Sequence, residues 1–208
     1  AGAMAPSDTR PVDFKDLVIK QRNVLSLHND LTDHVSFYAT AWFEALCTAV
    51  YLGGASRALE EVRKFGRSVH TEDGELLADL DGFHVECGRL NLKLRSTLAM
   101  ARSFGVSCDR YCKLVREGGE AHLLDGVAGD LMDLGSCIKW AGTGAAVEIE
   151  AGARSLIGTR AMSVNHPIYA LSEQVLFGPM HPTITARLER SMGMAMSSET
   201  PYTGLFEW

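Results

Sequence analysis

The stretch RLNLKLRSTLAMARSFGVSCDRYCKLVR, residues 89–116, decides the fold together with the apolar stretch that follows it to Ile157. On a helical wheel, its first half gathers apolar side chains within about 120° of each other. These are Leu90, Leu94, Leu98, Ala101 and Phe104. The pattern predicts one helix over 89–104, ended by Gly105, and a second over 107–117, because glycine is common just past a helix end.

The apolar stretch predicts a further helix over 120–140, followed by another over 145–162. The first repeats its apolar residues at spacings of three and four: Leu123, Val127, Leu131, Leu134 and Ile138. The run Gly142-Thr143-Gly144 is interpreted as the junction between the two helices. It is not a phosphate loop, since no strand precedes it and no Gly-Lys-Ser/Thr follows.

The rest of the chain has the same helical character. Leu, Ala, Met and Glu are plentiful, and runs of Val, Ile and Thr with period two are missing. Patterns and stop signals predict helices over 12–29, 33–52, 56–69, 75–83, 168–177 and 183–196, so the predicted class is all-α. Residues 1–11 are interpreted as a cloning remnant and polar lead. The apolar window 35–52 contains Glu44 and is short for a bilayer span, which favours a buried core helix.

Composition excludes several kinds of protein. The chain of 208 residues has five Cys without tandem spacing, which argues against a disulfide framework and favours a reducing compartment. No signal peptide is expected. Cys108, Cys112 and His122 are a candidate zinc set. On the wheel, however, both cysteines lie on an apolar face, where free Cys is commonly a small buried hydrophobe.

Charge is segregated along the chain. The net charge is −6, yet residues 89–116 contain seven basic side chains and one acid, between acidic blocks at 72–86 and 117–133. Such a block can bind anionic lipid or RNA phosphates, or it can be a solvated face paired with acidic neighbours. Four cations at roughly 1 kcal/mol each give only about 4 kcal/mol, a millimolar-scale affinity, unless an oligomer adds avidity. The predicted patch comprises Arg89, Lys93, Arg95, Arg102, Arg110, Lys113 and Arg116, helped by Arg63, Lys64 and Arg67.

Several short segments, in their order and spacing, resemble the influenza-type (orthomyxovirus) matrix protein. The segment 110–117, RYCKLVRE, is similar to the basic helix of that family. Other similar segments are 24–27, 134–137, 144–147, 189–192 and 197–199. Cys112 and Val115 occupy positions that are basic in the family, and only His166 falls in its Cys/His cluster region. These departures are consistent with a divergent genus such as the fish isaviruses.

The resemblance implies two helical bundles, 12–83 and 84–163, joined by a short linker, plus a C-terminal helical region over 164–208. It implies a matrix protein without enzymatic activity that polymerises beneath the viral envelope and bridges membrane to ribonucleoprotein. Its partners would be further copies in a head-to-tail array, anionic lipid, ribonucleoprotein or RNA, and the tails of envelope glycoproteins. It would lie in the virion and at the inner face of the host plasma membrane, with the host nucleus as a further location.

Two other interpretations stay open. One is an RNA-binding, nucleocapsid-type helical protein, and the other is a helical enzyme or metal sensor built on Cys108, Cys112 and a histidine. No catalytic residue, metal site or cofactor is predicted. The histidines are candidates for an acid-triggered switch: His28, His34, His70, His84, His122, His166 and His181.

Overall fold

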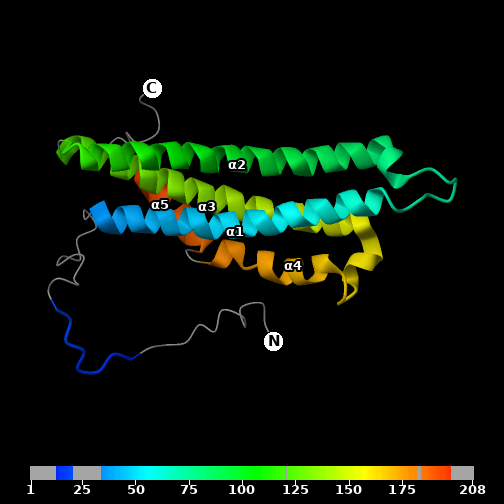
Figure 1. The fold of residues 1–208 in the computed structure, drawn as a ribbon, viewed down its shortest axis with the longest axis horizontal. Coiled ribbons are helices and arrows are strands. Elements are labelled where there is room, and N and C mark those ends of the chain that lie inside the picture. The colour runs from blue at the N-terminus through cyan, green and yellow to red at the C-terminus, as the bar shows by residue number, and fades with distance from the viewer. Residues whose placement is uncertain (1–12, 21–33, 120, 182–183, 198–208) are drawn as a thin grey trace.

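The chain folds around three long helices in a computed structural model that describes residues 13–20, 34–119, 121–181 and 184–197, without the side chains of 34–37 and 121–125. Figure 1 shows the long helices side by side, with two shorter helices beyond them. The α-helices are α1 (His34–Gly66), α2 (Asp81–Arg116), α3 (Ala121–Ile157), α4 (Pro167–Val175) and α5 (Thr185–Ser197). Short 3-10 turns are η3 (Leu77–Asp79), η4 (Gly158–Met162) and η5 (Gly178–Met180). In these ranges the only β pairing is an isolated bridge between His70 and Leu76, and the all-α prediction is confirmed.

The long helices run through glycines that were predicted to end them. Gly53 and Gly54 lie inside α1, Gly105 inside α2, and Gly142 and Gly144 inside α3. Some of these glycines allow two helices to approach closely. A Cβ atom on Gly142 would lie 2.3 Å from Thr48 Cγ2 of α1. Close packing there outweighs the roughly 1 kcal/mol by which glycine disfavours a helix, so the predicted junction at 142–144 is wrong.

The three long helices share a core that consists of three clusters along their length. At one end Ala41, Phe104 and Leu131 come from α1, α2 and α3, and at the other end Val62 and Phe83 pack with Ile157. A middle cluster again combines all three helices and adds Val175 of α4. Because each cluster crosses the predicted boundary at residues 83 and 84, residues 34–175 pack as one bundle instead of two. Every one of these clusters draws side chains from both predicted halves, so the described residues leave no separate second core.

Two predicted helices are not present as expected. Residues 13–20 are not helical, and the remainder of the predicted helix to 29 lies outside the described residues. The acidic helix predicted over 75–83 is divided into η3 and the first turn of α2, and the loop before it is closed by Thr71 N–H donating to Glu75 O at 2.8 Å and Leu77 N–H donating to Val69 O at 2.9 Å. Gly74 turns this loop with φ of +86°, a conformation that favours glycine. These backbone bonds replace the helical ones.

The apolar residues 35–52 form the first half of α1. Ala41, Glu44 and Thr48 are buried there, whereas Phe43 and Val50 are exposed. Within the described ranges, no helix has the length and apolarity needed to cross a membrane.

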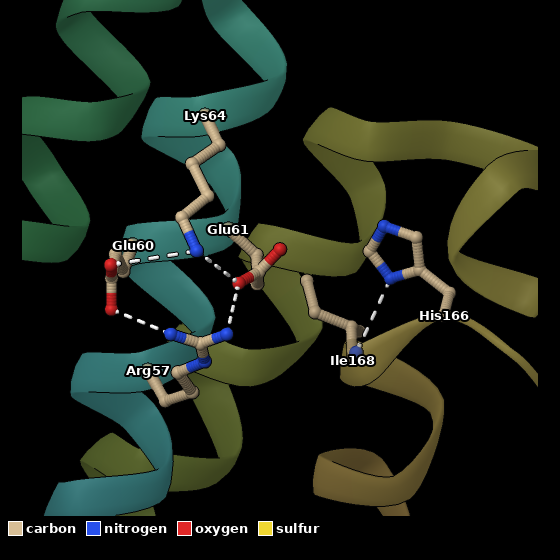
Figure 2. Close-up of polar contacts among 6 residues, drawn as sticks. All are labelled: Arg57, Glu60, Glu61, Lys64, His166 and Ile168. Atoms are coloured by element: carbon tan, nitrogen blue, oxygen red, sulfur yellow. Dashed lines mark hydrogen bonds and ion pairs between the residues drawn. The ribbon is translucent and has the colours of Figure 1, made fainter.

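A histidine caps the start of α4. His166 Nδ1 accepts a hydrogen bond from Ile168 N–H at 3.3 Å, and Pro167 occupies the first helical position (Figure 2). Replacing His166 with alanine removes this acceptor, and we expect a loss of about 1 kcal/mol in the free energy of unfolding. Asparagine at this position should keep most of the stability, because its side-chain oxygen also caps helices. Urea denaturation of both variants checks this, and equal losses in both would exclude capping as the cause.

Candidate functional site: a pocket between α1 and α2

Ion pairs inside the molecule compensate part of the predicted basic patch. Four of its ten members pair with carboxylates at up to 4.0 Å. These members are Lys64, Arg89, Lys93 and Lys113, whose partners are Glu60 and Glu61, Glu86, Glu148 and Glu117. The pairs lie at the surface, so each contributes little stability, but each also reduces the charge available to a membrane or to RNA.

The other patch residues divide between two places. Arg95 and Arg102 are exposed on α2, where they form no ion pair with any described residue, and Arg110 and Arg116 lie further along the same helix. Arg63 lies in the last turn of α1, and Arg67 directly follows the end of that helix, where its N–H donates to Arg63 O at 3.3 Å. In the structure, the pair Arg63 and Arg67 is therefore separate from the pair Arg95 and Arg102, although the predicted patch included all four.

Arg63 and Arg67 line a pocket of about 500 Å³ between the end of α1 and the start of α2, which we call the α1–α2 pocket. Its volume lies within the range of small-molecule sites. Its polar side chains include the two arginines, His84 and Asn91. Its apolar walls include Leu59, Val62, Ala78 and Phe83, and Glu60, Cys87 and Gly88 complete the lining.

Local packing fixes the wall of this pocket at Phe83. Phe83, in the first turn of α2, lies over Gly66, where a Cβ atom would be 2.5 Å from its ring. Phe83 is 8% exposed and belongs to the core cluster that also contains Val62. Glycine at 66 thus lets α2 begin directly beside the arginine turn of α1.

A network of ion pairs keeps the carboxylates near the pocket occupied. Figure 2 shows Arg57 and Lys64 on either side of Glu60 and Glu61. Arg57 bonds Glu60 at 2.9 Å and Glu61 at 2.7 Å, and Lys64 bonds Glu61 at 3.0 Å. The hydrogen bond from Arg57, and then the nearby Lys64 charge, lower the pKa of Glu60.

The guanidinium groups of Arg63 and Arg67 have no such partner among the described residues. The pocket combines two free cations and an apolar wall with one carboxylate, Glu60, which Arg57 and Lys64 neutralise. Chemically, it fits an anion that carries an apolar or aromatic body.

The candidate cysteine site has a different character. Cys108 is 1% exposed within the core, and the Cys112 thiol lies 3.2 Å from the Tyr38 hydroxyl. In the part of the chain that the structure describes, no group of three or more His, Cys, Asp or Glu side chains is placed to hold a metal. The side chain of His122 lies outside that part. The prediction from the helical wheel that Cys108 is a small buried hydrophobic residue is confirmed.

The candidate acid-switch histidines are spread over the molecule. His70 is exposed on the loop after α1, His84 lines the α1–α2 pocket, and His166 caps α4. His181 lies edge-on to Phe43, with ring centroids 6.4 Å apart. His28 and the side chains of His34 and His122 lie outside the described residues. No common switch site emerges from the described histidines.

Sequence reasoning missed two buried polar groups on α3. Lys139 is fully buried and donates to Gly178 O at 2.6 Å. Glu150 is 1% exposed and accepts from the Ser172 hydroxyl, with Arg154 at 3.5 Å. The sequence does contain a hint of the first group, because Lys139 directly follows Ile138 of the predicted apolar stripe. A charged side chain beside such a stripe can be buried only if it has a polar partner.

Comparisons with known proteins give a fold and no family. No family model matches the chain, and no curated protein matches it. Solved structures do match. A nitroalkane oxidase in complex with spermine has a TM-score of 0.67 at 17% identity, covering 82% of this chain and 37% of its own. Butyryl-CoA dehydrogenase from Megasphaera elsdenii has a TM-score of 0.60 at 12% identity, covering 79% of this chain and 38% of its own. PigA with FAD and proline has a TM-score of 0.58 at 14% identity, covering 76% and 36%.

The likeness is one of fold. The chain matches the helical part of an acyl-CoA dehydrogenase-like fold and spans less than two fifths of the length of these proteins. The neighbours include an oxidase and a dehydrogenase that use flavin, which contradicts the prediction that the chain is not an enzyme. The resemblance to matrix proteins stays a prediction that neither the structure nor these comparisons test.

Proposed function

We propose that this chain is the helical part of a flavin-dependent oxidoreductase, and that the α1–α2 pocket holds the phosphate-bearing part of FAD. The observation that carries the proposal is the pair Arg63 and Arg67, free of carboxylate partners in the described chain, in the lining of a ligand-sized pocket. It is supported by the fold shared with nitroalkane oxidase and with a PigA structure that contains FAD. When bound, the flavin supplies a two-electron acceptor, which no amino-acid side chain provides.

The residues of the pocket fit such a group. Guanidinium groups one helical turn apart suit phosphate oxygens, because arginine donates in a planar fork and stays charged at every physiological pH. His84 and Asn91 can add hydrogen bonds to phosphate or sugar oxygens. Phe83 and Val62 would keep water from one side of the ligand, which strengthens the charged contacts.

The other cavities fit this role less well. The cavity of about 230 Å³ further along α1 and α2 has no charged residue in its lining. The cavity of about 400 Å³ among α2, α3 and α5 has Glu189 as its one charged lining residue and no cation to offset its repulsion of phosphate, whereas Glu60 of the α1–α2 pocket lies with two arginines. The α1–α2 pocket alone among these three has cationic walls.

Isothermal titration calorimetry with FAD, ADP and riboflavin tests the proposal. We expect FAD and ADP to bind and riboflavin, which has no phosphate, to bind far more weakly. The double variant Arg63→Gln/Arg67→Gln should weaken binding of FAD and ADP by about 10-fold or more, a figure that allows for solvent screening at an exposed site.

The matched control is Arg95→Gln/Arg102→Gln, which removes the same charge from exposed, unpaired positions of α2 outside the pocket. This control should bind FAD as the unmodified chain does. Equal affinity for riboflavin and FAD, or equal loss of affinity in both double variants, would contradict a phosphate site at Arg63 and Arg67.

A further inference from the structure

Lys139 connects three elements at the centre of the fold. It lies on α3, is 0% exposed, and its ammonium group donates to the carbonyl oxygen of Gly178 in η5 at 2.6 Å. Glu44 of α1, 3% exposed, interacts electrostatically with it. Burial lowers the pKa of Lys139, while the Glu44 charge and, more weakly, the Cys47 thiol oppose this effect. A buried ammonium group is costly even when it is paired, so an apolar residue would serve simple packing better.

The turn that accepts this hydrogen bond fits closely against α1 and α3. A Cβ atom on Gly178 would lie 3.1 Å from Thr143 Cβ and 3.3 Å from the Tyr51 ring. The Thr143 hydroxyl in turn donates to Lys139 O at 2.6 Å. The turn is thus held both by a charge-assisted hydrogen bond and by the absence of a side chain at 178.

Few other contacts hold α5, which follows this turn. Leu188 is its only buried residue among those described. Among the hydrogen bonds that attach it are those from Thr185 Oγ1 to Pro179 O at 3.1 Å and from Trp140 Nε1 to Glu189 Oε1 at 2.9 Å. Beneath α5 lies the cavity of about 400 Å³, whose walls are nearly all apolar and include Met100, Leu188 and Met192. Cys137 and Ser136 of α3 also line it.

We propose that Lys139 is a latch: its hydrogen bond to Gly178 holds the turn and thereby keeps α5 packed along the apolar cavity. Loss of the latch releases η5 (178–180) and α5 (185–197) from α3 while the bundle of α1, α2 and α3 stays folded. Cys137, which is half-buried in the wall of the cavity, then becomes more accessible. The latch involves no flavin and no residue of the α1–α2 pocket, so it can be tested independently of the proposed function.

The test is the rate at which N-ethylmaleimide labels Cys137, measured by peptide mass spectrometry that resolves the five cysteines, without added ligand. In Lys139→Met, the methionine keeps the length of the side chain without its charge. We expect Cys137 to react roughly 10- to 100-fold faster than in the unmodified chain, as the loss of one charge-assisted hydrogen bond implies. Amide hydrogen exchange should rise over 178–197 and stay unchanged over α1 and α3.

Two further variants make the result specific. Gly178→Ala leaves Lys139 in place but displaces the turn, and it should raise the Cys137 rate in the same way. Lys93→Met removes a surface lysine that pairs with Glu148 and should change nothing at Cys137. An unchanged Cys137 rate in both Lys139→Met and Gly178→Ala would overturn the latch. So would an equal rise in hydrogen exchange over α1 and α3, because Lys139 would then only stabilise the core.

Discussion

Replacing Gly142 with alanine is expected to destabilise the protein by about 2 to 3 kcal/mol. The new methyl group would lie 2.3 Å from Thr48 Cγ2, and Thr48 has little room to move. It is 0% exposed, and its hydroxyl donates to Glu44 O at 2.8 Å within α1. The helices α1 and α3 must move apart to make room for the methyl group, and this weakens the packing between them, which is the most extensive helix–helix contact in the bundle. Urea denaturation followed by circular dichroism measures the change.

A second substitution shows whether the clash with Thr48 is the cause. Thr48→Ser removes the Cγ2 methyl and keeps the hydroxyl, so it should recover most of the stability lost in Gly142→Ala. The control is Gly144→Ala, which faces open space and should gain about 0.5 to 1 kcal/mol from helix propensity. If the losses from Gly142→Ala and Thr48→Ser simply add, the close approach of the two helices is not what requires glycine at 142.

Alkaline pH should destabilise the protein through Cys108. Burial, followed by the neighbouring Cys112 and Asp109, raises the pKa of the Cys108 thiol from 9.0 to about 11. Below pH 9 the thiol keeps its proton in both states. Between pH 9 and 11 it ionises only in the unfolded state, which favours unfolding. The free energy of unfolding should therefore fall by about 2 to 3 kcal/mol over this window on account of Cys108.

Comparison with Cys108→Ala isolates this contribution. The variant starts less stable at pH 8 because it leaves a small cavity, but its stability should decline less steeply above pH 9. Tyr38 adds a similar effect at higher pH in both proteins, since burial and its hydrogen bond with Cys112 raise its pKa to about 12. Parallel curves for the two proteins between pH 8 and 11 would show that Cys108 does not keep its proton in the folded state.

Periodicity predicted the helical class and much of the core, but not the lengths of the helices. Leu90, Leu94 and Phe104, which share the predicted apolar face, are all buried. Gly105 and Gly142, which were interpreted as stops, lie inside helices. The sequence alone does not distinguish a glycine that ends a helix from one that lets a second helix pack closely. At Gly142 the distinction comes from its contact with Thr48, 94 residues away in the chain.

The candidate site was only partly predictable for a related reason. Arg63 and Arg67 were identified as cations, but they stay unpaired because Arg57 and Lys64 pair with the nearby Glu60 and Glu61. The sequence also contained no sign that Phe83 would fold back over Gly66 to form a pocket. Wheel analysis assigns a face to each cation, whereas the pairing of charges between and along helices decides which cations are free.

The exposed pair Arg95 and Arg102 still carries the prediction that this surface binds anionic membrane. Co-sedimentation with phosphatidylserine vesicles at low salt tests it separately from the flavin site. Loss of binding in Arg95→Glu/Arg102→Glu would support that role, and an absence of vesicle binding by the unmodified chain would exclude it.

Amide hydrogen exchange with and without FAD tests the proposed flavin site most directly, because it locates the ligand on the chain without assuming any reaction. FAD, and ADP in the same way, should slow exchange in two segments, the end of α1 with the residue after it (59–67) and the start of α2 (83–91). That protection should be lost in Arg63→Gln/Arg67→Gln. Unchanged exchange in both segments at saturating FAD, or protection confined to α4 and α5, would contradict a phosphate site in the α1–α2 pocket.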